Sequence, residues 1–470
     1  MPQSSTAVRY PERYTQTCFL DFGEGSPELD ARAAATGFNG KSVFSDPAFA
    51  QNKTLPIHRW VPWIAGFSQD FVRDALNRHL ADRGTVLDPF SGVGTTLVES
   101  VLAGHTAVGF EINPYASLAC AVKLQCYRIE PERIREHIKA FRDFFTNAVN
   151  SDSEPQSKTP EGFKTRGDFY SPKVLRQVLH LWDFIKTIRD RKIQRLFQIA
   201  FASTMVSYSN YSYEPSLGQR KAVGRDGIED FPVGQTIEAR LSEMAQDVLW
   251  MRDRLGTRRP RSKVINASFF ECRKHLQRGS VDLLITSPPY LNNYHYNRNT
   301  RPHLYWLGFV KRPKDLEPLE RDNFGKYWQT VREQRCVKLY RKVSDPEIIQ
   351  TLDELRGKTP EKGVYGGNGW ANYAASYFND CYRFSGCVKY TLRKGGTALV
   401  VIGNSILQGV LMPTDRFLVK IAESVGLEPV EIHMPRTTRV GNSIIQSGVR
   451  VERAKDGHSL YEAVVELRKR

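Results

Sequence analysis

The segment with the clearest chemical potential is a short strand that ends in two prolines. It reads Thr286-Ser287-Pro288-Pro289-Tyr290 and follows the apolar run 281–285. Neither proline has an N–H group, so the turn offers carbonyl oxygens, and the hydroxyl of Ser287 adds a further acceptor. Such acceptors suit a planar exocyclic amine, while the ring of Tyr290 can stack on the heterocycle that carries it. The alternative is a turn that ends a strand and buries a tyrosine.

A glycine-rich turn is the second candidate. The apolar pair Val86-Leu87 is followed by Asp88-Pro89-Phe90-Ser91-Gly92-Val93-Gly94-Thr95, and a helix is predicted to begin near Thr95. Glycines let backbone amides approach a ligand, and a helix N-terminus supplies positive potential. The next predicted strand, 107–110, ends at Glu111, about 20 residues beyond the glycines. A carboxylate at this interval is suited to bind the two hydroxyls of a ribose. A glycine pair alone also occurs in packing turns, so the strand, the turn and the acid must be considered together.

Alternating strands and helices are expected to position both segments. Further strands are predicted at 263–270, 281–286, 397–404, 429–434 and 463–467, with helices at 370–393 and 415–425. This alternation predicts an α/β fold with a mostly parallel sheet covered on both faces. Aromatic residues at 57–72, which include Trp60 and Trp63, precede a helix predicted to be capped by Ser68 and are expected to be core.

Four regions organise the rest of the chain. Residues 1–55 lack a sustained period and are expected to form a tail or arm. Residues 121–261 favour helices and basic loops, and helical stripes such as Ile237, Leu241, Met244 and Val248 indicate a core. Residues 311–368 are highly charged and contain Gly and Pro clusters, typical of a second insertion or flap. The α/β portion then comprises 56–120 and 262–470.

The two motifs together resemble the cofactor and catalytic motifs of the DNA amino-methyltransferases, which methylate exocyclic amines with S-adenosylmethionine. The resemblance implies a seven-stranded, Rossmann-like methyltransferase sheet with a large helical insertion. It also implies catalytic roles for Ser287, Pro288, Pro289 and Tyr290. The implied cofactor-binding residues are Asp88, Pro89, Phe90, Ser91, Gly92, Gly94, Thr95, Glu111 and Thr286.

The first residue of the catalytic motif indicates which amine is methylated. Family members that methylate N6 of adenine usually carry Asn or Asp there, whereas Ser287-Pro288-Pro289-Tyr290 resembles the N4-cytosine type. The resemblance therefore favours cytosine, with adenine N6 as the alternative. An alternative function of a different class is that of a nucleic-acid-binding protein whose methyltransferase fold is catalytically inactive.

The charge of the chain favours DNA as its partner. The net charge is +16, the pI is near 9.5, and Lys and Arg recur along much of the sequence. A phosphate backbone suits such a surface, although a merely basic protein would have the same composition. An amine inside a duplex would have to be reached by base flipping. Expected DNA contacts on two polar, aromatic loops are Tyr211, Tyr213, Arg220, Lys221, Asn293, Tyr296, Arg298 and Arg301.

Cysteine usage and hydropathy bear on the compartment. The seven cysteines form no CxxC pair, which fits a reduced interior better than disulfides or a zinc site. No apolar run reaches the roughly 18 residues that span a bilayer. We therefore expect a cytoplasmic prokaryotic protein without a metal site or membrane segment, which methylates double-stranded DNA beside a companion restriction endonuclease.

Overall fold

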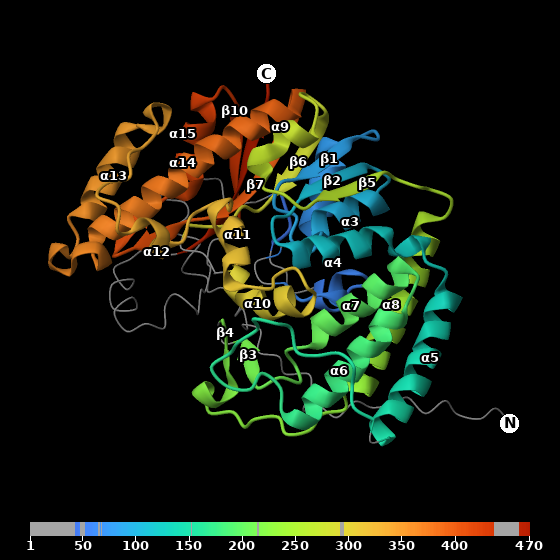
Figure 1. Cartoon of the computed structure of the whole chain (residues 1–470). Coiled ribbons are helices and arrows are strands. Elements are labelled where there is room, and N and C mark those ends of the chain that lie inside the picture. Colours follow the sequence, from blue (N-terminus) through green and yellow to red (C-terminus); the bar gives the residue numbers. More distant parts are fainter. Residues whose placement is uncertain are drawn as a thin grey trace, which may run out of the picture.

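A seven-stranded sheet forms the centre of the computed structural model, which describes residues 43–47, 52–63, 66, 68–151, 153–213, 216–291, 296–436 and 460–470 (Figure 1). The order of the strands is β10-β11-β7-β6-β1-β2-β5. Only β11 runs antiparallel to its neighbours in this sheet; every other pairing is parallel. The α/β fold with a seven-stranded, mostly parallel sheet is thus confirmed. The strands are β1 (Thr85–Asp88), β2 (Thr106–Phe110), β5 (Ser262–Ile265), β6 (Val281–Thr286), β7 (Leu392–Gly403), β10 (Glu428–Arg436) and β11 (Glu462–Arg468).

Both faces of the sheet are covered by helices, which explains why its central strands are apolar in succession. In β1, Val86 packs toward α2, while Leu87 belongs to the cluster that contains α14 and α15. Leu283 and Leu284 of β6 divide in the same way. The covering helices are α2 (Gln69–His79), α3 (Thr95–Leu102) and α4 (Pro114–Gln125) on one face, with α9 (Cys272–His275), α14 (Gly367–Thr391) and α15 (Thr414–Ser424) on the other.

A helical segment lies between β2 and β5, below the sheet in Figure 1. The stripe predicted at Ile237, Leu241, Met244 and Val248 is buried on α8. The core of this segment is continuous with residues of α3, α4 and α10, so the segment packs directly on one helical layer of the sheet. Its elements are η6 (Cys126–Arg128), α5 (Pro131–Asn150), α6 (Pro172–Thr187), α7 (Arg191–Thr204), β3 (Tyr211–Tyr213), β4 (Leu217–Gln219), η7 (Arg220–Val223) and α8 (Val233–Leu255).

Short helices and a second hairpin complete the described chain. Residues 311–368 fold mostly as short helices, and α13 packs on α14. No helix in the described ranges is long and apolar enough to cross a bilayer. The remaining elements are η5 (His58–Trp60), η8 (Phe269–Glu271), α10 (Tyr296–Trp306), η9 (Pro313–Leu316), α11 (Glu317–Arg321), α12 (Trp328–Val331), η10 (Arg341–Val343), α13 (Pro346–Arg356), η11 (Pro360–Tyr365), β8 (Ser405–Leu407) and β9 (Val410–Met412).

The structure differs locally from two predictions. The stretch around Tyr211, predicted as a loop, contains a short antiparallel hairpin in which Tyr211 pairs with Gln219. Within the expected N-terminal tail, Phe44 is buried against Phe71 and His433. Residues 1–42 and 48–51 lie outside the described residues.

Candidate active site

The two predicted motifs lie side by side at the carboxyl ends of neighbouring parallel strands. Leu87 of β1 is in register with Leu284 of β6, so both strands end at the same edge of the sheet. The hydroxyl of Thr286 donates a hydrogen bond of 2.7 Å to Oδ1 of Asp88, and both side chains are buried. The start of the glycine turn therefore contacts the residue that precedes Ser287.

The glycine turn owes its shape to two residues with left-handed backbone. Gly92 and Gly94 have φ angles of 50° and 92°, which residues other than glycine rarely adopt. A Cβ atom on Gly94 would lie 2.6 Å from Sγ of Cys120, so the turn approaches α4 as closely as a backbone can. The Gly94 N–H donates to the carbonyl of Ser91 at 2.7 Å, and α3 begins at the next residue.

Glu111 links the glycine turn to the segment that follows β2. Its Oε2 accepts from the N–H of Gly92 at 2.9 Å, and its Oε1 accepts from the N–H of Asn113 at 2.7 Å. Asn113 in turn caps α4 by accepting from the N–H of Tyr115 at 3.0 Å. One carboxylate thus holds together the turn and the start of the next helix.

Burial perturbs both carboxyl groups at this edge. It raises the pKa of Asp88 to about 6, although the hydrogen bond from Thr286 lowers it in part. It raises the pKa of Glu111 to about 7, against the opposing effect of the two backbone N–H groups. A ligand that brings a positive charge or hydroxyl donors would favour the ionised form of each group.

The proline turn is held by two elements, α14 and β11. The carbonyl of Pro289 accepts a hydrogen bond of 2.9 Å from the hydroxyl of Tyr377 on α14. The hydroxyl of Ser287 donates to the hydroxyl of Tyr290 at 3.4 Å, and that hydroxyl donates to Glu462 of β11 at 3.0 Å. The ring of Tyr290 is therefore anchored at its polar end. Sequence reasoning missed Tyr377 and Glu462, since neither lies in a motif.

Aromatic side chains surround the glycine turn. The ring of Phe90, predicted to contact the cofactor, packs 5.3 Å from Phe324 and 5.7 Å from Phe384, between centroids. On the other side, Nε1 of Trp63 lies 3.0 Å from the position that a Cβ atom on Gly92 would take. The sequence predicted Trp63 as core; the side chain is half-buried, packs against the core cluster that contains α3 and α4, and also lies against the turn.

The residues predicted to contact DNA occupy two segments that the fold brings together. The hydroxyl of Tyr213 donates to the carbonyl of Asn299 on α10 at 3.2 Å, and Oδ1 of Asn299 accepts from the N–H of Leu217 at 3.1 Å. The hairpin β3–β4 is thereby tied to the helix that follows the proline turn. Tyr211 is buried against Phe169 and supports the hairpin.

The cationic members of this set differ in their surroundings. Lys221 and Arg298 are exposed, and the side chain of Arg220 donates to the carbonyl of Asp226 at 2.9 Å. The guanidinium of Arg301 lies 5.6 Å from the ring centroid of Tyr305. Asn293 and the side chain of Tyr296 lie outside the described residues.

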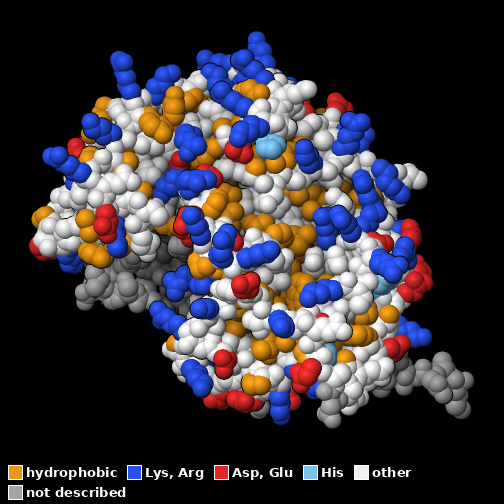
Figure 2. All heavy atoms as spheres, viewed as in Figure 1, with side chains coloured by type: hydrophobic (Ala, Val, Ile, Leu, Met, Phe, Trp, Pro, Cys, Tyr) orange, Lys and Arg blue, Asp and Glu red, His pale blue; other side chains and the backbone are white. Residues whose placement is uncertain are grey.

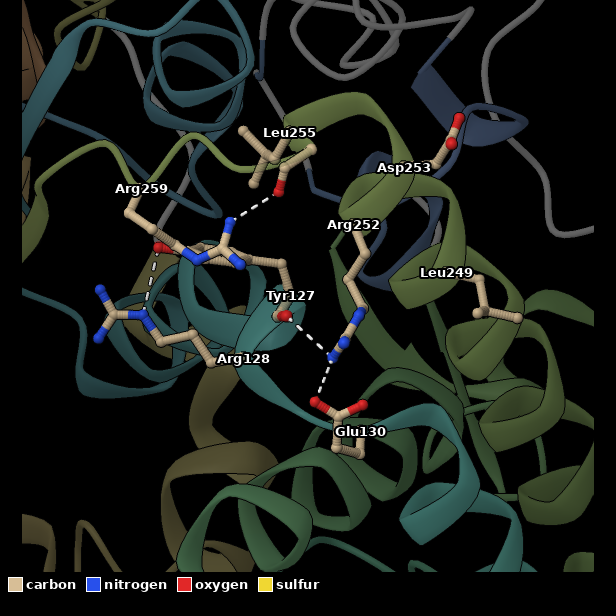
Figure 3. Close-up of a pocket in the computed structure, with 9 residues that line it drawn as sticks. Tyr127, Arg128, Glu130, Leu249, Arg252, Asp253, Leu255 and Arg259 are labelled. Atoms are coloured by element: carbon tan, nitrogen blue, oxygen red, sulfur yellow. Dashed lines mark hydrogen bonds and ion pairs between the residues drawn. The ribbon is translucent and has the colours of Figure 1, made fainter.

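A separate pocket of about 550 Å³ lies between η6 and the end of α8 (Figure 3). Nearby, Arg258 donates to the carbonyl of Leu102, the last residue of α3. Because α3 begins at the glycine turn and ends here, this pocket is at the opposite edge of the sheet from the two motifs. It is lined by Tyr127, Arg128, Glu130, Leu249, Arg252, Asp253, Leu255, Gly256 and Arg259.

Sequence comparison finds methyltransferases that match most of the chain. The chain is 23% identical over 446 residues to the Type II methyltransferase M.BsoBI of Geobacillus stearothermophilus, covering 87% of this chain and 85% of that protein. It is 24% identical over 431 residues to the Type II methyltransferase M.AvaI of Nostoc sp., covering 85% of each. The chain is a methyltransferase. These relatives confirm the resemblance to DNA methyltransferases inferred from the two motifs.

Other comparisons add less about this methyltransferase. Over 80 residues it is 35% identical to the Type II methyltransferase M.MjaII of Methanocaldococcus jannaschii, which covers 17% of this chain and 15% of that protein. The rRNA methyltransferase aviRa from Streptomyces viridochromogenes aligns with a TM-score of 0.31 at 9% identity, over 90% of this chain and 93% of that chain. No family model matches the chain.

The cofactor of this methyltransferase family, S-adenosylmethionine, fits the residues at the sheet edge. Its ribose hydroxyls are donors suited to Glu111, and its sulfonium would favour ionised carboxylates such as Asp88. The positive φ angles at Gly92 and Gly94 let the turn fold back between Trp63 and Cys120, which sets its backbone beside these carboxylates. The carboxylate acceptors at this edge of the sheet thus match the chemistry of the cofactor.

Proposed function

We propose that this methyltransferase acts on DNA and transfers the methyl group of S-adenosylmethionine to the exocyclic N4 amine of cytosine. The observation that carries the proposal is the hydrogen bond of 2.7 Å between Thr286 and Asp88. It joins a turn suited to the cofactor to a turn suited to a planar amine. Ser287 supports cytosine as the target base, because DNA amino-methyltransferases that methylate adenine usually carry Asn or Asp at this position.

The protein's task in this reaction is to orient the amine and exclude water. When bound, S-adenosylmethionine supplies an electrophilic methyl group and carries the driving force for transfer. The hydroxyl of Ser287 and the carbonyl of Pro288 would accept hydrogen bonds from the N–H groups of cytosine N4, so that the nitrogen lone pair faces the methyl group. The same acceptors favour the partly positive nitrogen of the transition state, and after transfer the nitrogen loses one proton to solvent.

We further propose that the target base leaves the duplex before it reacts. Stacking on Tyr290 would offset part of the few kcal/mol lost in unpairing and unstacking. The hairpin β3–β4 and α10 would contact the surrounding DNA, since Lys221 and Arg298 are exposed on them or next to them. Figure 2 is consistent with a polyanionic partner, because Lys and Arg side chains are spread over the whole visible face.

The test is the identity of the methylated nucleoside. Purified protein would be incubated with S-adenosylmethionine and duplex DNA from a host without DNA methylation, and the digested product analysed by chromatography and mass spectrometry. N4-methylcytosine is expected. N6-methyladenine would overturn the cytosine assignment but keep the amine chemistry, whereas a ring-methylated base would contradict the proposed site.

The biological setting proposed for the enzyme is restriction–modification or host defence. The Type II names of the relatives support this setting and a companion restriction endonuclease. Methylation should then occur at one defined sequence. Sequencing of DNA from an expressing host, by a method that maps N4-methylcytosine, would reveal that sequence, and methylation without sequence preference would count against the setting.

A further inference from the structure

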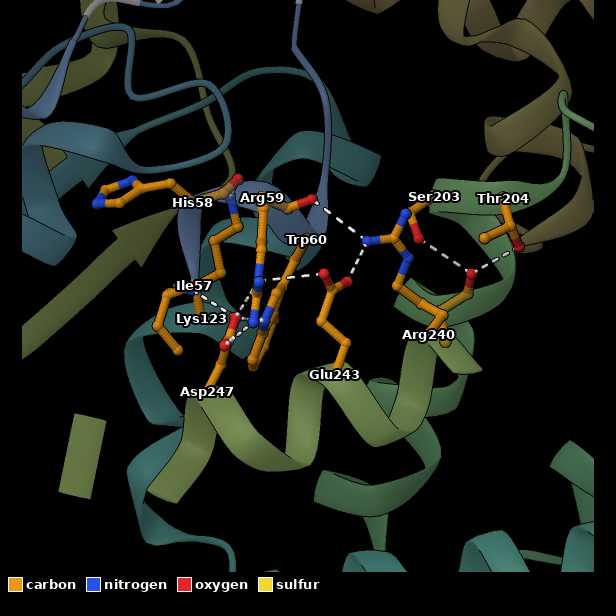
Figure 4. Close-up of polar contacts among 11 residues, drawn as sticks. Ile57, His58, Arg59, Trp60, Lys123, Ser203, Thr204, Arg240, Glu243 and Asp247 are labelled. Carbon is orange, nitrogen blue, oxygen red and sulfur yellow. Dashed lines mark hydrogen bonds and ion pairs between the residues drawn. The ribbon is translucent and has the colours of Figure 1, made fainter. Parts of the chain in front are cut away.

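A buried carboxylate of the helical segment holds a strap of chain that lies against the glycine turn. The strap is residues 52–63, and the carboxylate is that of Asp247 on α8, which is 2% exposed (Figure 4). Its Oδ2 accepts from the N–H of Ile57 at 2.8 Å and from Nε1 of Trp60 at 2.8 Å. Arg59 donates to both oxygens, from Nε at 3.1 Å and from Nη2 at 2.6 Å. Every hydrogen bond described for this carboxylate comes from the strap.

The strap adopts an unusual backbone where Asp247 binds it. Ile57 has a φ of 67°, in the left-handed region that a β-branched residue rarely adopts. Its side chain is fully buried, and its N–H is one of the donors to Asp247. Backbone in a disfavoured region persists only where its surroundings hold it, and such positions cluster at functional sites.

The opposite side of the strap is fixed to the helix that begins at the glycine turn. Nε2 of His58 lies 2.7 Å from Oε1 of Glu99 on α3, and Arg73 donates to Oε2 of Glu99 at 2.7 Å. The buried Lys123 of α4 donates to the carbonyl of His58 at 3.3 Å. The strap is therefore held between α8 on one side and α3 and α4 on the other.

The end of the strap reaches the glycine turn itself. Nε1 of Trp63 lies 3.0 Å from the position of a Cβ atom on Gly92, and its ring centroid is 6.2 Å from that of Tyr115. At the other end, the amide of Asn52 lies 3.5 Å from the hydroxyl of Thr95, the first residue of α3. A displacement of the strap would therefore move side chains that line the turn.

We propose that Asp247 is a positioning residue for the cofactor. Through the strap it sets Trp63 against Gly92, so that the helical segment, which carries the proposed DNA-contacting hairpin, and the cofactor turn share one rigid connection. This inference rests on the proposed function. It assigns to a residue of the helical segment, far from both motifs in the sequence, a role in binding S-adenosylmethionine.

The test is the variant Asp247→Asn, studied in the full chain. All of the groups that bind Asp247 are hydrogen-bond donors. In Asp247→Asn the NH2 group would replace one acceptor oxygen and would face these donors without an acceptor of its own. We expect the dissociation constant of S-adenosylmethionine, measured by calorimetry, to rise about tenfold. The matched control is Glu238→Gln on the same helix, whose carboxylate pairs on the surface with Arg142. This control should bind the cofactor like the parent protein.

A milder variant covers the case in which Asp247→Asn does not fold. Arg59→Gln removes the guanidinium, whose side chain is 24% exposed, and leaves the donors of Ile57 and Trp60 in place. We expect it to raise the dissociation constant about threefold. Wild-type affinity in this variant, if Asp247→Asn is unfolded, would overturn the inference.

A double-mutant cycle separates positioning from a purely structural role. If Asp247 acts through the end of the strap, Asp247→Asn should cause less than twofold further loss of affinity in a protein that already carries Trp63→Ala. Additive losses, or wild-type affinity in folded Asp247→Asn, would overturn the inference. A parent protein that does not bind S-adenosylmethionine would instead contradict the proposed function.

Discussion

The hydroxyl of Tyr290 donates a hydrogen bond of 3.0 Å to Oε1 of Glu462, across 172 residues of sequence. The first residue of β11 thus holds the aromatic residue of the proline turn. A ring that is fixed in this way loses little freedom when a base stacks on it, which favours binding of an extruded nucleobase. The anchor also explains how a residue at the rim of a turn can keep a defined orientation.

Removal of the Tyr290 ring should affect transfer and spare cofactor binding. We expect Tyr290→Ala to lower the rate of methyl transfer about 10- to 100-fold, which corresponds to the loss of one base-stacking contact. The dissociation constant of S-adenosylmethionine should change less than about twofold, because Tyr290 lies on the proline turn and not on the glycine turn. Single-turnover rates and calorimetry would measure the two effects. Equal loss of both would contradict the assignment.

Loss of the Glu462 anchor should have a smaller effect of the same kind. Glu462→Gln keeps an acceptor for the Tyr290 hydroxyl but removes its charge, and hydrogen bonds to charged groups are the stronger ones. We expect transfer to fall about three- to tenfold with unchanged cofactor affinity. In a Tyr290→Phe background the substitution should have no further effect. An additional loss there would show that Glu462 acts independently of Tyr290.

A side chain on the glycine turn should abolish cofactor binding. Gly92→Val places a β-branched residue at a φ of 50° and sets its Cβ 3.0 Å from Nε1 of Trp63, so the backbone is strained and either the Trp63 ring or the turn must shift. We expect the affinity for S-adenosylmethionine to fall more than about tenfold. Gly386→Ala on α14 is the control, since its Cβ would meet no atom within 4 Å. An unchanged titration for Gly92→Val would refute the assignment of this turn.

Cofactor affinity should rise with pH until Glu111 is ionised. Burial raises the pKa of Glu111 to about 7, so in the free protein this carboxyl is mostly protonated below that pH. Binding of a ribose requires the acceptor form and therefore releases a proton. Affinity should fall by up to about tenfold per pH unit below pH 7 and level off above it. Calorimetry between about pH 6.5 and 8.5, above the pKa of about 6 of Asp88, measures this, and Glu111→Gln should bind weakly and without the slope.

An exposed cation near the hairpin should contribute to DNA binding without sequence preference. Lys221 is exposed, and we expect Lys221→Ala to weaken binding of duplexes of any sequence and to lower the salt slope by about 1. Lys139 is the matched control, since it is exposed on α5, and α5 lies on the side of the helical segment away from the hairpin β3–β4 (Figure 1). Equal salt slopes for Lys221→Ala and the parent would remove this residue from the proposed interface.

The parts of the site that the sequence could predict are those formed by local pattern. Asp88 and Thr286 each end an apolar run, and neighbouring parallel strands carry such residues to one edge of the sheet. The interval from the glycines to Glu111 identified the third member. The structure brings all of these together, through hydrogen bonds from Thr286 to Asp88 and from the Gly92 N–H to Glu111.

The rest of the site depends on contacts that no local pattern encodes. Tyr377 reaches Pro289 across 88 residues, and it lies on a helix whose apolar stripe gives no hint of that contact. The strands of the hairpin at Tyr211 are three residues long, too short for alternation to be detected. Trp63 was predicted as core because aromatic residues at helical spacing usually are, and only the packed structure shows its place against Gly92.

The position of β11 has a consequence for biosynthesis. This strand is inserted between β7 and β10, and in the described sheet β10 pairs only with it. A ribosome must therefore translate past residue 468 before β10 can join the sheet, and Glu462 reaches Tyr290 only then. Until that moment nascent chains would expose the unpaired edges of β7 and β10, and Tyr290 would lack its hydrogen bond to Glu462. Premature termination should thus yield products prone to aggregate, with no partially active enzyme among them.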